Sequence, residues 1–95
     1  MKYRLAFVGI DRFSDPQIRD LSGAANDAKA LWGLFADTLP DSDAYLLANE
    51  EGTATAVREA FNRALLDATQ EDVALIFFAG HGTRDHRLVV HAPIA

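Results

Sequence analysis

The chain has 95 residues, of which 49% are hydrophobic and 24% charged, and it contains no cysteine. This length fits one small domain, and the composition excludes a mainly disordered chain. The formal net charge of -5 disfavours nucleic acid and anionic membranes as partners, since both attract clustered lysine and arginine. The lack of disulfides fits a cytoplasmic location, which is what we expect.

The first third of the sequence predicts a strand, a loop and a helix. Residues 3–10 are apolar at nearly consecutive positions, which predicts a strand buried on both faces. The polar residues 11–23 predict a long loop. Apolar side chains then recur at helical spacing over residues 24–39, between a predicted N-cap at Ser22 and the helix breaker Pro40.

The rest of the chain predicts a second helix between two further strands. Residues 44–48 read as a short strand, and Thr55 is a predicted N-cap for a helix whose apolar stripe extends to Ala68. Residues 72–79 form a longer apolar run and predict a third strand. Residues 88–92 are also apolar and predict a fourth short strand.

This β-α-β-α-β order predicts an α/β fold, with a mostly parallel sheet, right-handed crossovers and helices on both faces. The first and third strands look buried on both faces, so we expect them to be central neighbours, with the second strand beyond the first. Ligands of such sheets bind at the carboxyl ends of strands, where the strand order reverses. The loops concerned are residues 11–23 and 79–87.

A histidine, His81, follows the third predicted strand and lies between Gly80 and Gly82. Imidazole has an ordinary pKa of about 6.5, which suits general acid and base catalysis. The flanking glycines leave room for a substrate, and the Gly82 amide can donate to an oxyanion. The alternative interpretation is a tight turn with a solvated histidine.

Other chemistries fit the sequence less well. Four residues in or after this turn have side chains that bind metals: His81, Asp85, His86 and His91. Their spacing matches no zinc pattern, so no metal site is predicted. Asp11 follows the first strand as a phosphoacceptor would, but the third strand lacks the aspartate that this chemistry needs. Residues 23–29 lack the glycine pattern of a phosphate-binding loop.

Three motifs occur in order along the chain. Residues 21–31 read LSGAANDAKAL, residues 49–57 read NEEGTATAV, and residues 76–82 read IFFAGHG. Together they resemble the first part of the caspase-like peptidase domain, peptidase C14, in its metacaspase and prokaryotic branch. That family shows a Gly-x-x-Asn-Asp-Ala helix start, a Thr-led second helix and a strand that ends in Ser-Gly-His-Gly. The resemblance extends from about residue 3 to residue 92.

The resemblance implies a partial caspase-like three-layer sandwich, in which residues 1–95 form the N-terminal part of a p20-type domain. His81 matches the catalytic histidine, and Gly82 matches the position whose amide helps to form the oxyanion hole. Asp27 matches an acidic residue of the S1 pocket, which implies cleavage after Arg or Lys. An alternative role for Asp27 is a first-turn carboxylate that interacts with the helix dipole.

The substrate site implied by the resemblance also includes Ala79 and Gly80. Ala79 departs from the family pattern, because many members have serine at this position. The family's cysteine nucleophile lies on the next core strand, so the resemblance implies that these 95 residues lack it and are inactive alone. The hydroxyls of Ser14, Ser22 and Thr83 are not expected to replace the thiol.

These inferences lead to two functional hypotheses. The first is a thiol endopeptidase, with a protein or peptide substrate and the remainder of the same peptidase domain as partners. The second is a catalytically inactive caspase-like module that binds a partner protein. We also expect self-association through the exposed edge of the third strand. No cofactor is predicted, and a dependence on calcium stays open.

Overall fold

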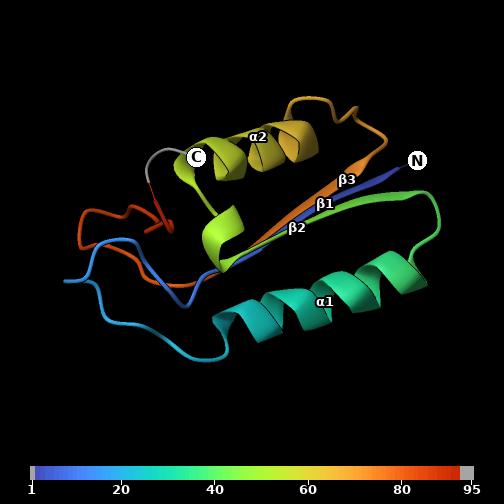
Figure 1. Ribbon diagram of the computed structural model, residues 1–95. Helices are drawn as coiled ribbons and strands as arrows, with labels where there is room; N and C mark the ends of the chain where they lie inside the picture. The colour runs from blue at the N-terminus through green and yellow to red at the C-terminus, as the bar shows by residue number, and fades with distance from the viewer. Residues whose placement is uncertain (1, 93–95) are drawn as a thin grey trace.

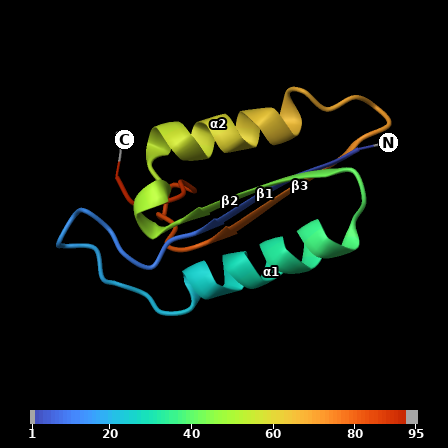
Figure 2. The same cartoon turned by 45° about the vertical axis from the view of Figure 1, so that its right-hand side comes forward.

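The computed structural model of the protein describes residues 2–92. Its elements are, in chain order, β1 (Tyr3–Gly9), α1 (Ala24–Thr38), β2 (Ser42–Ala48), the 3-10 turn η1 (Asn49–Glu51), α2 (Ala54–Leu65) and β3 (Val73–Ala79). The two helices lie on opposite faces of the sheet (Figures 1 and 2). The predicted three-layer α/β architecture is therefore confirmed.

The sheet has the strand order β2-β1-β3, and both pairs are parallel. In register, Tyr3 pairs with Ser42 on one side and with Val73 on the other. The predicted order of the strands is confirmed. β1 is the central strand, and its residues from Leu5 onward are buried, as its continuous apolar run predicted.

For the described residues, the expectation that the third strand is central and buried on both faces is wrong, whereas the expected exposed edge of this strand is present. β3 forms an edge of the three-stranded sheet, its residues are half-buried or exposed, and Val73 is 42% exposed. A continuous apolar run indicates a strand that has apolar neighbours. It does not report how many strands pair with it.

Alternate side chains of β1 pack against the two helices. Leu5 and Phe7 are buried on the α1 side together with Ala28. On the other face, Ala6 packs with Ala60 and Ala64 of α2. Small helical side chains at these contacts let both helices lie close to the central strand.

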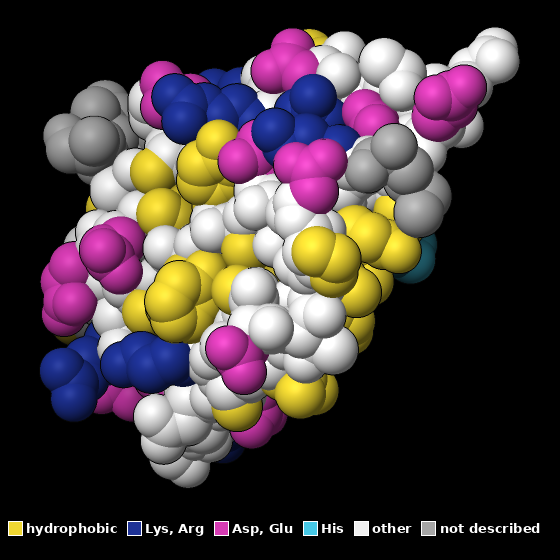
Figure 3. Space-filling view, turned by 90° about the vertical axis from the view of Figure 1, so that its right-hand side faces the viewer, with side chains coloured by type: hydrophobic (Ala, Val, Ile, Leu, Met, Phe, Trp, Pro, Cys, Tyr) yellow, Lys and Arg dark blue, Asp and Glu magenta, His cyan; other side chains and the backbone are white. Residues whose placement is uncertain are grey.

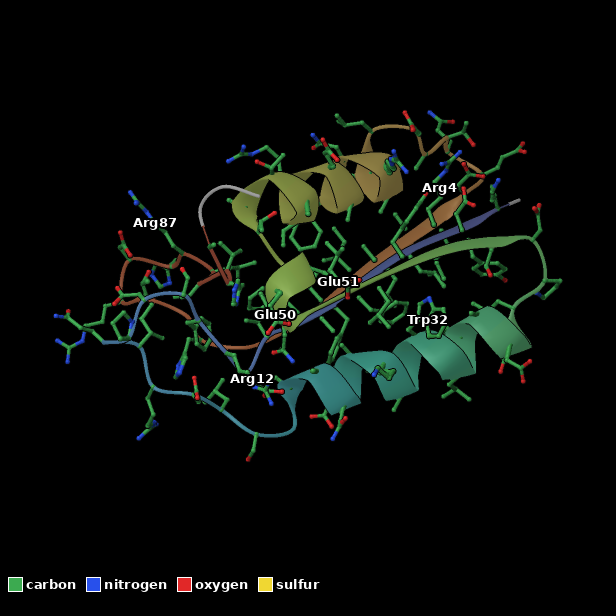
Figure 4. The ribbon with its side chains drawn as sticks, viewed as in Figure 1. Arg4, Arg12, Trp32, Glu50, Glu51 and Arg87 are labelled. Atoms are coloured by element: carbon green, nitrogen blue, oxygen red, sulfur yellow. The ribbon has the colours of Figure 1, made fainter. Side chains whose placement is uncertain are left out.

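Gly9 shows how close this approach is at the end of β1. A β-carbon added at Gly9 would overlap the carbonyl oxygen of Ala24 and would lie 2.7 Å from Cβ of Ala28. The first turn of α1 therefore occupies the space that a side chain would need. In the middle of the helix, Trp32 points from α1 to the sheet, where its Nε1 donates to the Ala44 carbonyl oxygen at 3.2 Å (Figure 4).

Both predicted N-caps are wrong. The N-cap position of α1 is Gly23 and not Ser22, with a left-handed φ of 101° and no side-chain cap of its own. The N-cap of α2 is Thr53 and not Thr55, and its hydroxyl accepts from the amide of Ala56 at 3.2 Å. Each helix start offers two residues suited to an N-cap, Ser22 and Gly23 before α1, and Thr53 and Thr55 at α2. The tertiary position of the preceding loop selects between them.

Two further boundaries differ from the predictions. α2 ends at Leu65, so Ala68 lies beyond the helix. Residues 88–92 do not form a fourth strand and make only isolated bridges, from Leu88 to Gly82 and from Ala92 to Thr53. The two bridges go to different segments, so no continuous ladder forms.

Ion pairs join the strands at their amino ends. Arg4 Nε lies 3.3 Å from Asp72 Oδ2, and Lys2 Nζ lies 3.4 Å from Asp43 Oδ2. Figure 3 shows the corresponding side of the molecule, where acidic and basic side chains alternate and apolar side chains lie between them. Over the part of the chain that the structure describes, no helix has the length and apolar character needed to cross a membrane.

Candidate active site

The two loops that the topology singled out meet at the carboxyl end of the sheet. Loop 11–23 follows β1, and residues 80–92 follow β3, at the same side of the molecule in both ribbon views (Figures 1 and 2). The amide of Ile10 donates to the carbonyl oxygen of Ala79 at 3.0 Å, which continues the β1–β3 pairing to the point where the loops diverge. His81 lies two residues beyond this bond.

The imidazole of His81 contacts loop 11–23. Its Nε2 lies 2.9 Å from the carbonyl oxygen of Arg19. A carbonyl oxygen only accepts hydrogen bonds, so Nε2 carries a hydrogen, and the lone pair of the neutral ring is on Nδ1. The ring also packs on Phe13, with 5.2 Å between the ring centroids. The side chain is thereby held with Nδ1 as its basic atom.

The backbone around His81 leaves the Gly82 amide available. The carbonyl oxygen of His81 accepts from Val89 at 3.0 Å, and the amide of Thr83 donates to Arg87 at 2.9 Å. These two bonds flank the antiparallel bridge between Gly82 and Leu88. Among the described residues, no hydrogen bond uses the amide of Gly82, which is exposed. It can donate to an oxyanion that forms beside His81.

The predicted residues Ala79, Gly80, His81 and Gly82 form one continuous segment at the end of β3. A β-carbon at Gly80 would lie 3.1 Å from Cε1 of Phe78 and 3.4 Å from the carbonyl oxygen of Ile10. There is therefore little space for a side chain at Gly80. At Gly82 there is more, because the atom nearest to an added β-carbon is 3.7 Å away. Ala79 is half-buried.

Asp27 lies in the first turn of α1, at the same end of the sheet as His81, because α1 runs antiparallel to the strands (Figure 1). The residue is exposed and borders the buried stripe that begins at Ala24 and Ala28. Among the described residues, no ion pair holds its carboxylate. The structure thus places Asp27 at the His81 end of the sheet, and among the described residues no hydrogen bond or ion pair joins the two side chains.

Sequence reasoning missed the residues that hold the start of loop 11–23. Both carboxylate oxygens of Asp11 accept backbone amides of α1, from Ala24 at 2.8 Å and from Ala25 at 3.1 Å. Asn49 Oδ1 accepts from the amides of Asp11 at 2.9 Å and Arg12 at 3.3 Å. Figure 4 shows Arg12 at the same end of the molecule as Glu50 and Glu51 of η1. The position of Asn49 directly after the predicted second strand was the sequence signal that could have indicated this role.

His91 also contacts this loop. Its Nδ1 lies 2.7 Å from the carbonyl oxygen of Arg12, and its own carbonyl oxygen accepts from the amide of Ser14 at 2.9 Å. In the sequence His91 was considered only as a metal ligand. Among the described residues, no group of three or more potential ligands lies close enough to hold a metal ion.

The hydroxyl nearest to His81 in sequence is occupied. Thr83 Oγ1 donates to the carboxylate of Asp85 and accepts from the amide of Arg87 at 3.0 Å. Arg87 itself projects outward on the loop (Figure 4) and pairs with Asp85 at 3.2 Å. These contacts hold Thr83 in the turn.

Two cavities lie away from His81. One, of about 180 Å³, is bounded by β2 and α2, where Arg63 lies over the ring of Tyr45. The other, of about 360 Å³, lies between α2 and residues Leu88 and Val90. Neither is lined by the segment that carries His81.

These features define an α/β domain with a histidine and a free backbone amide at the carboxyl end of a parallel sheet. The chain belongs to the caspase domain family, peptidase C14, because the model of that family matches residues 4–93. A search of curated proteins and a search of solved structures each found no match. Family membership supports a peptidase-type function in general.

Proposed function

We propose that this domain is the histidine-bearing part of a cysteine endopeptidase of the metacaspase type. The observation that carries the proposal is the hydrogen bond from His81 Nε2 to the Arg19 carbonyl, at 2.9 Å. It leaves Nδ1 as the basic atom, beside the free amide of Gly82. Since the 95 residues contain no cysteine, the thiol has to come from a segment outside them.

In the proposed reaction, His81 Nδ1 takes the proton of the thiol, and the thiolate attacks the carbonyl carbon of the peptide bond. The amide of Gly82 donates to the resulting oxyanion. The imidazolium then protonates the leaving amine as the C–N bond breaks, which gives a thioester. A water molecule, deprotonated by the same imidazole, hydrolyses the thioester and regenerates the thiol.

The proposed specificity is for Arg or Lys on the amino side of the cleaved bond. Asp27 supports it as an exposed carboxylate at the correct end of the sheet, without an ion pair among the described residues. A carboxylate of this kind can pair with a substrate guanidinium through two parallel hydrogen bonds. Ala79 and Gly80 would border the same pocket and leave it without a hydroxyl.

The test is to produce the domain together with the polypeptide encoded beyond Ala95 and to assay peptides that carry Arg, Lys or Asp before the scissile bond. We expect cleavage after Arg or Lys that a thiol-alkylating reagent abolishes. His81→Ala should remove nearly all of this activity, because members of a catalytic unit act non-additively. Undiminished cleavage by His81→Ala would refute the catalytic assignment.

The alternative function is a caspase-like module that binds a partner protein without cleaving it. It follows if no thiol is supplied, because the hydroxyl of Thr83 is held by Asp85 and the Arg87 amide and so is not free to replace a thiol. If the longer polypeptide supplies no reactive thiol, it should bind a partner stably and leave that partner intact. Mass spectrometry of the recovered partner distinguishes the two functions.

A further inference from the structure

Two histidines donate to carbonyl groups of the same loop, residues 11–23. His81 Nε2 lies 2.9 Å from the Arg19 oxygen, and His91 Nδ1 lies 2.7 Å from the Arg12 oxygen. Because carbonyl oxygens only accept, both ring nitrogens carry hydrogens. The loop is thus held by one imidazole close to each end.

The backbone of His91 adds two further bonds. Its carbonyl oxygen accepts from the amide of Ser14, and its amide donates to the carbonyl oxygen of Gly52, both at 2.9 Å. Two residues earlier in the chain, the amide of Val89 donates to the carbonyl oxygen of His81 at 3.0 Å. Hydrogen bonds and short stretches of chain therefore form a closed ring from His81 through residues 89–91 and loop 11–23 back to His81.

Phe13 lies inside this ring of contacts. Its neighbours in sequence, Arg12 and Ser14, are the two residues that His91 binds. The Phe13 ring packs on the ring of His81, and it belongs to an apolar cluster that includes Val90. His91 thus fixes the backbone on both sides of the aromatic residue that contacts the catalytic imidazole.

The remaining contacts of the loop do not fix its middle part. Asn49 binds the amides of Asp11 and Arg12 only, at the start of the loop. Asp15 makes local turn bonds with Gln17 and Ile18. Between the start of the loop and Arg19, the described bonds to other segments come from His91.

We propose that His91 is a positioning residue, which fixes the orientation and tautomer of His81 by holding the loop that carries the Arg19 carbonyl. The effect of His91 on catalysis rests on the proposed function, whereas its effect on the orientation and tautomer of His81 does not. When one ring nitrogen loses its acceptor, the proton of a neutral imidazole is shared between both nitrogens. The fraction of His81 with its lone pair on Nδ1 would then fall.

The test uses ¹⁵N-histidine labelling and long-range ¹H–¹⁵N spectra of the whole chain at alkaline pH, where imidazoles are neutral. We expect His81 to show only the Nε2–H pattern. The two variants to compare are His91→Asp and His91→Asn, because Asp and Asn side chains have the same shape. Only Asn keeps an N–H donor for the Arg12 carbonyl. His91→Asp should therefore lose the single-tautomer pattern, and His91→Asn should restore it. Backbone amide spectra establish that each variant is folded.

The matched control is His86→Asn, in the turn between His81 and His91. His86 is exposed and has a left-handed φ of 66°, which Asn tolerates. This variant should leave the His81 pattern unchanged. A folded His91→Asp chain that keeps the single Nε2–H pattern would overturn the proposal.

A second measurement needs no variant. If the ring of contacts is one cooperative unit, the amides of Ser14 and Val89 in the native chain should show equal protection from hydrogen exchange. Exchange of the Ser14 amide at the rate of an unstructured peptide would overturn the proposal, even if every His91 variant failed to fold.

In the assembled peptidase, His91→Asp should lower kcat by about tenfold to a hundredfold with little change in KM, because misplacement of a catalytic group acts on the chemical step. His91→Asn should recover most of this loss. The tautomer measurement requires neither thiol nor substrate. A changed tautomer with an unchanged kcat would thus contradict the catalytic role of His81 and not the positioning by His91.

Discussion

Asp11 caps helix α1 from 13 residues before Ala24, with its Oδ1 atom 2.8 Å from the amide of that residue. The second oxygen accepts from Ala25 at 3.1 Å, so one carboxylate satisfies two free amides of the first turn. The carbonyl oxygen of Asp11 also accepts from the amide of Leu21 at 2.8 Å. The aspartate therefore fixes the start of α1 and the end of the loop beyond Arg19.

Asp11→Ala should lower the free energy of unfolding by about 1–2 kcal/mol, since it removes a helix cap that makes two charge-assisted hydrogen bonds. Denaturant-induced unfolding followed by circular dichroism measures the loss. Asp20→Ala, an exposed change in the same loop, is the control and should have little effect. Equal midpoints for the two variants would contradict the capping role.

Gly9→Ala should destabilise the fold by about 1–3 kcal/mol, because the new methyl group overlaps Ala24 and Ala28 of α1. Gly33→Ala provides the opposite case. A β-carbon there meets nothing within 4 Å, and the residue lies inside α1, so the change should stabilise by about 0.5–1 kcal/mol. Shifts of the same sign in thermal melts would show that the β1–α1 contact is less tight than described.

Asp72 should make stability depend on pH. Hydrogen bonds from the amides of Thr69 and Lys2, together with Arg4, lower its pKa from 3.8 to about 2. A carboxyl group whose pKa is lower in the folded state contributes stability above its unfolded pKa. That contribution is lost as the pH falls from about 4 to about 2.

Asp72→Asn should therefore be less stable than the unsubstituted chain at neutral pH, and the difference should shrink below pH 4. Unfolding curves recorded from pH 7 to pH 2 measure it. Glu71→Gln, at the exposed neighbouring residue, should show no such pH-dependent difference. A constant difference for Asp72→Asn across the whole range would rule out the carboxylate as its cause.

Asp27→Asn tests the proposed specificity in the assembled peptidase. It should lower kcat/KM for Arg substrates by about tenfold or more, because an amide cannot form the charged bidentate pair. Asp37→Asn changes an exposed carboxylate at the other end of the same helix and should leave the kinetics unchanged. If both variants cleave Arg peptides at the normal rate, another residue selects the substrate.

The sequence by itself determined β1, β2, β3 and the two helices, the strand order β2-β1-β3, the helices on opposite faces and the place of His81 at the carboxyl end of the sheet. It did not determine the helix caps, and the fourth strand that it predicted does not form. The elements depend on apolar periodicity, which can be read from a short window, and their arrangement follows from the general right-handedness of β-α-β connections. The motifs, together with the family match over residues 4–93, determined the class of the domain.

Only the tertiary structure decided which residues complete the site. The bonds from Asp11 to Ala24, from His81 to Arg19 and from His91 to Arg12 join positions 13, 62 and 79 residues apart. No periodic pattern encodes such pairs, because each forms only after two loops have been placed by the packing of β1 against both helices. The physical reason is that helical and strand periodicity is a local property of the sequence. The burial of β3 at the sheet edge and the partner of each polar group depend on the whole fold.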